Sequence, residues 1–275
     1  METIDVYKVI EGKNPKLARR LPRWVIDYLR RTIHEREVNE ILTRFGDLEG
    51  IAFVRAALQY MRVGYHAVGM ERLDPKGRYV FASNHPFGGL DGLMLADEVC
   101  TYFGDVRVVV NDLLMHLEPI KSLFVPVNKH GRQQERSVEA FNEAFASDVP
   151  IVTFPAGLCS RRQKGEVRDL AWKPNFIKKA VAYGRDVVPV YFDGRLSNFF
   201  YRLSNFRKAL GVRVNIEMLY LVDEMFRQGG SDFEIVIGEP IPCDRLLARG
   251  RTPLQATQMV RERAYALREA VGRRA

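Results

Sequence analysis

Short apolar runs recur along the chain from about residue 78, and windows with a helical spacing of apolar residues separate them. A short run suits a strand that is buried on both faces, whereas the longer windows suit helices. Strands that alternate with helices predict an α/β fold, in which a mainly parallel sheet is flanked by helices on both faces. The expected strands are residues 78–83, 106–110, 122–127, 150–155, 186–192 and 233–238, and the expected helices include 90–103, 133–147 and 174–183.

Residues 1–70 differ from the rest, because their apolar pattern is helical in stretches such as EREVNEILTRF and GIAFVRAALQYMRV. The later part of the chain contains neither an internal repeat nor a Gly/Ser-rich linker. The sequence therefore predicts a helical extension over residues 1–70 and a single α/β domain over residues 71–275.

Within the extension, residues 13–31 form a basic amphipathic stretch in which Asp27 is the single acid. A basic amphipathic helix with an interfacial aromatic residue binds anionic membranes, and each cation near the surface contributes about 1 kcal/mol. An ordinary capping helix with a basic, solvated face explains the pattern equally well. The residues predicted to contact the membrane are Arg19, Arg20, Arg23, Trp24, Arg30 and Arg31.

The net charge of +8 would attract nucleic acid, acidic small molecules and anionic membranes alike. The aromatic residues of NFFYRLSNFRKAL and IEMLYLVDEMF have helical spacing, which favours core packing or the lining of an acyl tunnel. Basic residues do not interleave with them on a strand face, so nucleic acid is not an expected partner.

Cellular location is indicated by the cysteines and by the length of the apolar runs. Three widely spaced cysteines (Cys100, Cys159 and Cys243) suit a reducing interior better than a disulfide framework or a metal site. No apolar run approaches the roughly 20 residues that cross a bilayer. We expect a cytoplasmic protein that is peripheral on the inner face of the membrane.

The loop NHPFGGLDG follows the apolar run RYVFAS, which places His85 at the carboxyl end of a strand and Asp91 at the start of a helix. Gly88 and Gly89 permit a tight turn between them. A histidine that is hydrogen-bonded to a carboxylate has a fixed tautomer and a more basic second nitrogen, as a general base requires. Alternatively, Asp91 caps its helix and His85 is an ordinary loop residue.

Three later stretches follow this loop in order: FVPVNKHGRQQER (124–136), TFPAGLCSRRQKG (153–165) and VVPVYFDG (187–194). Together with the His-Asp loop they resemble the glycerolipid acyltransferase superfamily, whose members acylate lysophospholipids and related acceptors. In that family an apolar strand precedes an Arg-bearing turn, the third block reads F-P-E-G-x-x-S, and the fourth is an apolar strand with an internal proline. The resemblance covers roughly residues 79–194, and the rest of the chain is covered only loosely.

Two positions depart from the family pattern. The spacing between His85 and Asp91 is one residue longer than usual, and Ala156 stands where the family has Glu. Since the third block is associated with holding the acceptor, Ala156 predicts an acceptor other than one with a phosphate on glycerol. The whole pattern is most similar to the branch that acylates hydroxyls of lyso-aminolipids such as ornithine or glycine lipids.

The resemblance implies transfer of a fatty acyl group from a thioester of coenzyme A or acyl carrier protein to a lysolipid hydroxyl, without a metal or a cofactor. His85 would be the general base and Asp91 the carboxylate that orients it. Backbone N–H groups near Gly88 and Gly89 are candidates for stabilising the oxyanion. The predicted substrate-binding residues are Gly88, Gly89, Lys129, Arg132, Phe154, Pro155, Gly157, Ser160, Arg161 and Arg162.

Two alternatives stay open from the sequence: a hydrolase that activates water with the same pair, and a non-catalytic basic lipid-binding module. Cys159 is expected to be a buried thiol, because no G-x-S-x-G elbow surrounds it. P-loop, dinucleotide and zinc-peptidase motifs are missing from the sequence. The remaining histidines, for which structural or surface positions are expected, are His34, His66, His116 and His130.

Overall fold

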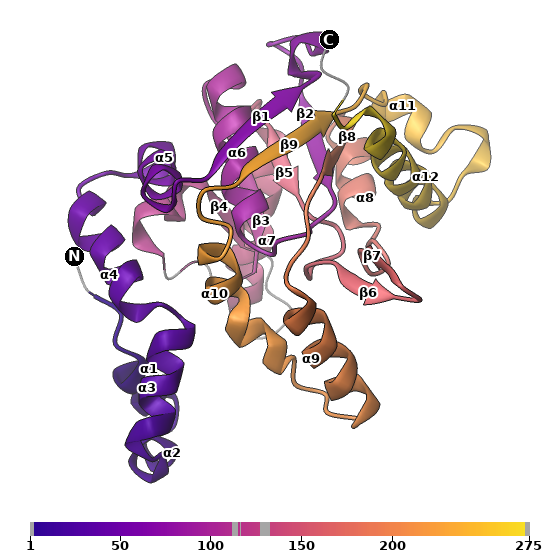
Figure 1. The fold of residues 1–275 in the computed structure, drawn as a ribbon. Coiled ribbons are helices and arrows are strands. Elements are labelled where there is room, and N and C mark those ends of the chain that lie inside the picture. Colours follow the sequence, from indigo (N-terminus) through magenta and orange to yellow (C-terminus); the bar gives the residue numbers. More distant parts are fainter. Residues whose placement is uncertain (1–2, 112–114, 116, 127–132, 273–275) are drawn as a thin grey trace.

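The computed structural model describes residues 3–111, 115, 117–126 and 133–272. Its centre is a seven-stranded sheet with the strand order β1-β9-β8-β2-β5-β3-β4 (Figure 1). Strands β8 and β9 pair antiparallel, and the other neighbouring pairs are parallel. The strands are β1 Gly64–Val68, β2 Tyr79–Ser83, β3 Arg107–Val110, β4 Phe124–Pro126, β5 Ile151–Thr153, β8 Asp186–Phe192 and β9 Asp232–Ile237.

Helices cover both faces of the sheet, and strand β2 shows why both faces need cover. All of its side chains are buried: Tyr79 and Phe81 point into one apolar core, whereas Val80 and Ala82 point into the other. The first core is closed by α5 (Gly50–Met61) and α6 (Leu90–Phe103). The second is closed by α7 (Gln133–Ala146), α8 (Asn175–Ala182), α11 (Cys243–Leu246) and α12 (Pro253–Ala266). The predicted fold class is confirmed.

Three strands are absent from the prediction. Strand β1 pairs with β9 at the edge of the sheet, and β6 (Arg161–Gln163) forms a two-stranded hairpin with β7 (Glu166–Arg168). The predicted helical extension over residues 1–70 therefore includes one strand of the sheet. Helix α5, also within that range, packs against α6 of the predicted α/β domain.

The first four helices project from one side of the sheet (Figure 1). They are α1 Val6–Lys13, α2 Pro15–Arg20, α3 Arg23–Thr32 and α4 Glu35–Phe45. His34, between α3 and α4, connects them to the rest of the molecule: its Nε2 lies 3.0 Å from Oδ1 of Asp223, and its ring stacks on Phe226. Among the described helices, none has the length and hydropathy that a bilayer crossing requires.

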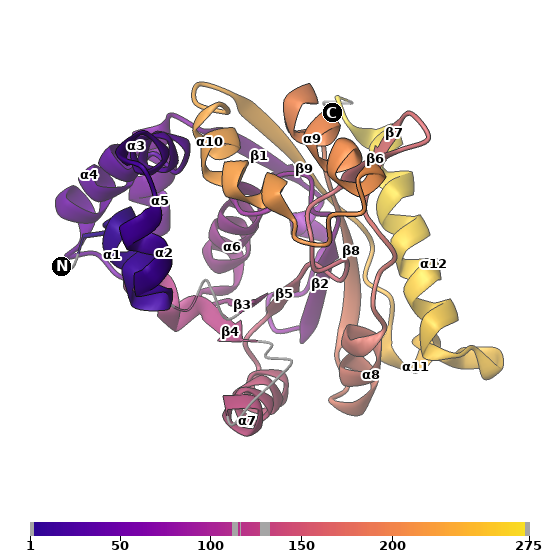
Figure 2. The ribbon, with the colours of Figure 1, turned by 90° about the horizontal axis from the view of Figure 1, so that it is seen from below.

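The segment after β8 projects on the same side. It comprises α9 (Asn198–Ala209), a 3-10 helix η4 (Ile216–Tyr220) and α10 (Leu221–Phe226). Helix α9 begins at a cap in which the Ser197 hydroxyl accepts a hydrogen bond from the backbone N–H of Phe200. Figure 2 views the molecule from this side.

Candidate active site

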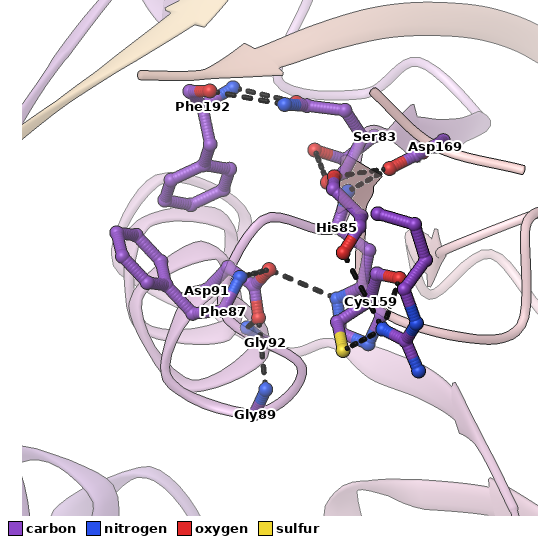
Figure 3. Close-up of polar contacts among 12 residues, drawn as sticks. Ser83, His85, Phe87, Gly89, Asp91, Gly92, Cys159, Asp169 and Phe192 are labelled. Atoms are coloured by element: carbon purple, nitrogen blue, oxygen red, sulfur yellow. Dashed lines mark hydrogen bonds and ion pairs between the residues drawn. The ribbon is translucent and has the colours of Figure 1, made fainter. Parts of the chain in front are cut away.

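His85, in the loop between β2 and α6, meets Asp91, which lies in the first turn of α6 (Figure 3). Nδ1 of His85 lies 2.9 Å from Oδ2 of Asp91, so the longer spacing between them is accommodated by the loop. The Asp91 side chain is fully buried, and its carboxylate accepts hydrogen bonds from the N–H groups of Phe87 (3.0 Å), Gly89 (3.1 Å) and Gly92 (3.0 Å). These bonds fix the carboxylate before any substrate binds.

The ring of His85 is thereby oriented as a general base requires. Because an ionised carboxylate can only accept, Nδ1 carries the proton and Nε2 has a free lone pair. Burial lowers the pKa of His85, but the charge and hydrogen bond of Asp91, together with the charge of Asp169, raise it above its usual value overall. The side chain remains 15% exposed, so the ring is not sealed from the surface.

A second carboxylate, Asp169, holds the backbone of the same loop. Its Oδ1 accepts hydrogen bonds from the N–H of His85 (3.2 Å) and the hydroxyl of Ser160 (2.6 Å), and its Oδ2 accepts one from the indole of Trp172 (2.8 Å). The N–H of Ser160 donates to the carbonyl of His85 (2.7 Å), and the ring of Phe154 stacks on the His85 ring at 4.2 Å. Two residues of the third sequence block (153–165), Phe154 and Ser160, thus contact His85 directly.

Sequence reasoning missed both Asp169 and Asn84. The side-chain amide of Asn84 accepts from the N–H of Phe192 (2.7 Å) and donates to its carbonyl (3.0 Å), which ties the end of β2 to the end of β8. The sequence could have indicated Asn84, because this residue directly precedes His85. Asp169 carried no comparable signal, because 84 residues separate it from the histidine whose backbone it holds.

Arg161, predicted to bind substrate, is buried and makes its hydrogen bonds within the protein. Its side chain is 1% exposed, and it donates to the carbonyl (2.8 Å) and sulfur (2.7 Å) of Cys159 and to Oε1 of Glu217 (3.2 Å). Arg162 is partly exposed; it donates to the side chain of Asn198 (2.7 Å) and lies over the ring of Tyr201. Of the two arginines, Arg162 is the better placed to meet an anionic group.

Cys159 is buried, as expected. Burial raises the pKa of its thiol to about 11, although the neighbouring Arg161 acts in the opposite direction. A thiol with this pKa is protonated near neutral pH, so a nucleophilic role is disfavoured.

The other predicted substrate-binding residues lie in distinct surroundings. Gly88 has a φ of +76°, and a side chain there would meet Cys159 and Leu221. The N–H of Gly89 is bound to Asp91, which removes it from the candidates for an oxyanion site.

Two predicted substrate-binding residues of the third sequence block lie in a turn. The carbonyl of Pro155 accepts a hydrogen bond from the N–H of Lys173, and Gly157 has a φ of +68°. Lys129 and Arg132 lie outside the described residues.

Ala156 is buried in the apolar core with Trp172 and Phe176. A methyl group enclosed there is not available to an acceptor. The position therefore gives no support to an inference about the acceptor.

Two further histidines occupy structural positions, as expected. His34 is paired with Asp223, and Nε2 of His66 lies 3.2 Å from Oε2 of Glu234 across strands β1 and β9. His116 and His130 lie outside the described residues. Among the residues that are described, no group of three or more His, Cys, Asp or Glu could hold a metal ion.

The residues predicted to contact a membrane lie on α2 and α3. Trp24 is 71% exposed, and Arg19, Arg20, Arg23 and Arg31 are also exposed. Arg30 is half-buried and lies within 3.4–3.7 Å of carboxylate oxygens of Asp5, Asp27 and Glu35. The exposed arginines among the predicted membrane contacts are therefore the other four.

A buried carboxylate that orients a histidine, at the carboxyl end of a parallel strand, is typical of α/β enzymes that use a general base to activate a hydroxyl. Comparison with known proteins agrees with this class. The chain belongs to the Acyltransferase family, whose model matches residues 8–273. It is therefore an acyltransferase.

Two relatives are similar over almost their whole length. Both are named lyso-glycine lipid O-acyltransferase, one from Bacteroides thetaiotaomicron and one from Phocaeicola vulgatus. Each is 42% identical over 265 residues, which cover 96% of this chain and 97% or 95% of the relative. A solved structure, the 1-acyl-sn-glycerophosphate acyltransferase PlsC from Thermotoga maritima, matches with a TM-score of 0.49 and 14% identity over 82% of this chain and 79% of that one.

Proposed function

We propose that this acyltransferase moves a fatty acyl group from a thioester to a hydroxyl of a lysolipid, with His85 as the general base and Asp91 as the carboxylate that orients it. The observation that carries the proposal is the 2.9 Å contact between the two side chains, together with the three N–H groups that fix Asp91. General-base catalysis of this kind contributes roughly 10²- to 10⁴-fold to the rate.

The chemical step balances without a metal or a cofactor. Nε2 of His85 takes the proton of the acceptor hydroxyl while its oxygen attacks the carbonyl carbon of the thioester. The C–S bond then breaks, and the leaving sulfur takes the proton from the imidazolium. Asp91 stabilises the transient positive charge on the ring.

The acceptor we propose is a lyso-glycine lipid. Support comes from the name that both 42% identical relatives carry. A glycine headgroup linked through its amine presents a carboxylate, and the partly exposed Arg162 offers a planar, bidentate partner for such a group.

We further propose that the donor is acyl coenzyme A or acyl carrier protein and that the enzyme works on the inner, cytoplasmic face of an anionic membrane. Arg19, Arg20, Arg23 and Arg31 would meet the lipid headgroups, with Trp24 at the interface. Lys129 and Arg132 would contribute positive charge toward the anionic donor.

The test is to incubate purified protein with each thioester and, in parallel, with lyso-glycine lipid, lysophosphatidic acid or no acceptor, and to identify the products by mass spectrometry. We expect diacylated glycine lipid from the wild-type protein and roughly 10²- to 10⁴-fold slower formation of it by His85→Ala. Free fatty acid formed at the same rate with and without acceptor would instead identify a hydrolase. Preference for lysophosphatidic acid would reject the acceptor but leave the catalytic pair standing.

A further inference from the structure

Residues 198–220 carry an unusual concentration of exposed apolar side chains. Seven of the fifteen exposed large apolar residues in the described part of the chain lie in this segment. Phe206 is 63% exposed, Leu210 62% and Val214 70%. Such a concentration of exposed apolar side chains in one segment indicates an interaction surface. We name it the α9–η4 surface, and its apolar members are Phe199, Phe206, Leu210, Val212, Val214, Ile216 and Leu219.

The charges of the same segment have one sign. Arg202, Lys208 and Arg213 are exposed, whereas the single acid between residues 198 and 220, Glu217, is fully buried. Apolar side chains interspersed with cations are the composition of elements that lie in the headgroup region of an anionic bilayer.

The backbone of the segment is held in place by buried ion pairs. Glu217 accepts from Nε of Arg207 (2.8 Å) and from Arg161 (3.2 Å), and Arg207 also donates to the carbonyl of Val212 (2.7 Å). These contacts join η4 and the loop after α9 to α9 itself and to β6. The exposed apolar side chains are therefore not needed to hold the segment together and are free to meet a partner.

The surface is adjacent to the proposed catalytic loop. Strands β2 and β8 are parallel neighbours, so His85 and the segment after β8 leave the sheet at the same edge. A side chain placed on Gly88 would come within 3.2 Å of Leu221, the residue that follows η4. Arg161, two residues after the Cys159 that also borders Gly88, bonds to Glu217 in η4.

The surface is also continuous with the N-terminal helices. The hydroxyls of Tyr28 in α3 and Tyr220 in η4 share a hydrogen bond, and the rings of Phe199 and Tyr220 lie 5.0 Å apart. In Figure 1, α9 and helices α1 to α3 extend on the same side of the sheet. Trp24 of α3 is exposed in this part of the molecule.

We propose that the α9–η4 surface is a second lipid-contacting element, which buries its apolar side chains in an anionic bilayer beside the His85 loop. This inference goes beyond the function proposed above, because it requires neither a particular acceptor nor the N-terminal arginines. A second copy of the chain is a poor occupant: a two-fold interface would bring six cations together with no exposed acid from the segment to balance them.

The first experiment measures binding to vesicles of phosphatidylcholine and phosphatidylglycerol by co-sedimentation. The variant Phe206→Ser, Leu210→Ser, Val214→Ser should lower the partition coefficient about ten-fold or more, because several apolar side chains lose their burial in lipid. The matched control is Leu254→Ser, which changes an equally exposed leucine (64%) on α12 and should bind as wild type. Unchanged unfolding midpoints would show that all variants fold.

The second experiment measures insertion directly. A tryptophan at Leu210 or, as control, at Leu254 is placed in a Trp24→Phe background, where the remaining Trp172 is buried. The protein is tethered by a C-terminal His-tag to vesicles that contain a nickel-chelating lipid and brominated acyl chains. Emission from Leu210→Trp should shift to the blue and be quenched, whereas that from Leu254→Trp should not.

Three outcomes would overturn the inference. They are equal vesicle binding by the triple serine variant and wild type, an unquenched Leu210→Trp on tethered protein, and a lipid-free dimer that the triple variant converts to monomer. In the first two cases the proposed acyl transfer is unaffected, because it is tested separately, by comparing the products of wild type and His85→Ala, and that comparison can be made on acceptor dispersed in detergent without vesicles.

Discussion

At the scale of single residues, the proposed chemistry depends on how the loop holds two side chains. Asp91 is bound by three backbone N–H groups, and the backbone of His85 is bound by Asp169 and Ser160. Neither side chain needs to reorganise when a substrate arrives. This is the arrangement in which a general base is most effective, because the geometry is set during folding.

Replacing His85 by Ala should remove the general base while leaving the loop in place. We expect acyl transfer to fall by roughly 10²- to 10⁴-fold. The unfolding midpoint should change little, because the hydrogen bonds of Asp91 to the backbone remain. Steady-state kinetics and thermal unfolding of the same preparation check both points, and retention of most of the activity would contradict the role of His85.

The pH dependence should report the His85-Asp91 pair. His85 has a pKa above its usual value of 6.5, so the neutral base forms only at a pH higher than that. We therefore expect kcat/KM to rise with pH, with a midpoint above 6.5.

The raised pKa of His85 also affects the free energy of unfolding. It stabilises the fold below pH 6.5, and this contribution is lost as the pH rises through the pKa of His85 in the folded state. In Asp91→Asn the midpoint of the activity profile should move to lower pH, and an unmoved midpoint would show that another group titrates.

At the scale of elements, buried ions connect β6, α9 and η4. Arg161, Arg207 and Glu217 are each less than one-tenth exposed, and the carboxylate bridges the two guanidinium groups. Such a network costs desolvation energy, so its value lies in fixing where the elements sit relative to one another.

Glu217→Gln should be strongly destabilising, because it leaves two buried arginines without a counter-charge. The expected loss in the free energy of unfolding is about 3–5 kcal/mol. Glu269→Gln, at an exposed position, is the matched control and should be near neutral. Chemical denaturation of the three proteins makes the comparison, and a cost for Glu217→Gln as small as that of the control would refute this reading of the network.

The agreement between sequence and structure also differs by element. Strands such as β2 and β8 were predictable, because burial on both faces requires a continuous apolar run. Strand β1 is half-exposed along its length, and β6 and β7 have three residues each, so none of the three leaves such a run. The His85-Asp91 pair could be predicted because the two residues are only six positions apart in the sequence. Asp169 and Glu217 could not, because their partners come close only after the chain has folded.

At the scale of the whole molecule, the elements that carry exposed cations extend in one direction. Helices α2 and α3, which carry exposed arginines, and the segment from α9 to η4 lie on the side toward which the His85 loop leaves the sheet. If this side meets a membrane, a lysolipid can reach the base without leaving the bilayer surface.

Arg19→Gln, Arg20→Gln, Arg23→Gln should weaken binding to anionic vesicles and reduce its dependence on salt. Attraction between exposed charges and headgroups is screened beyond about 8 Å at physiological ionic strength, so wild-type binding should also fade as salt is added. Arg245→Gln, Arg249→Gln, at exposed positions near α11, serves as the control. Sedimentation with vesicles at several salt concentrations distinguishes the variants, and equal binding to neutral vesicles would rule out an electrostatic attachment.

The three N–H groups that bind Asp91 also make the proposed catalytic pair observable by hydrogen exchange. Amides in an irregular loop or in the first turn of a helix ordinarily exchange quickly with solvent, but those of Phe87, Gly89 and Gly92 are bound to a buried carboxylate. Any opening that releases all three must displace Asp91, which separates it from His85. The exchange rate of these amides would therefore report how often Asp91 separates from His85, the proposed base, in the absence of substrate.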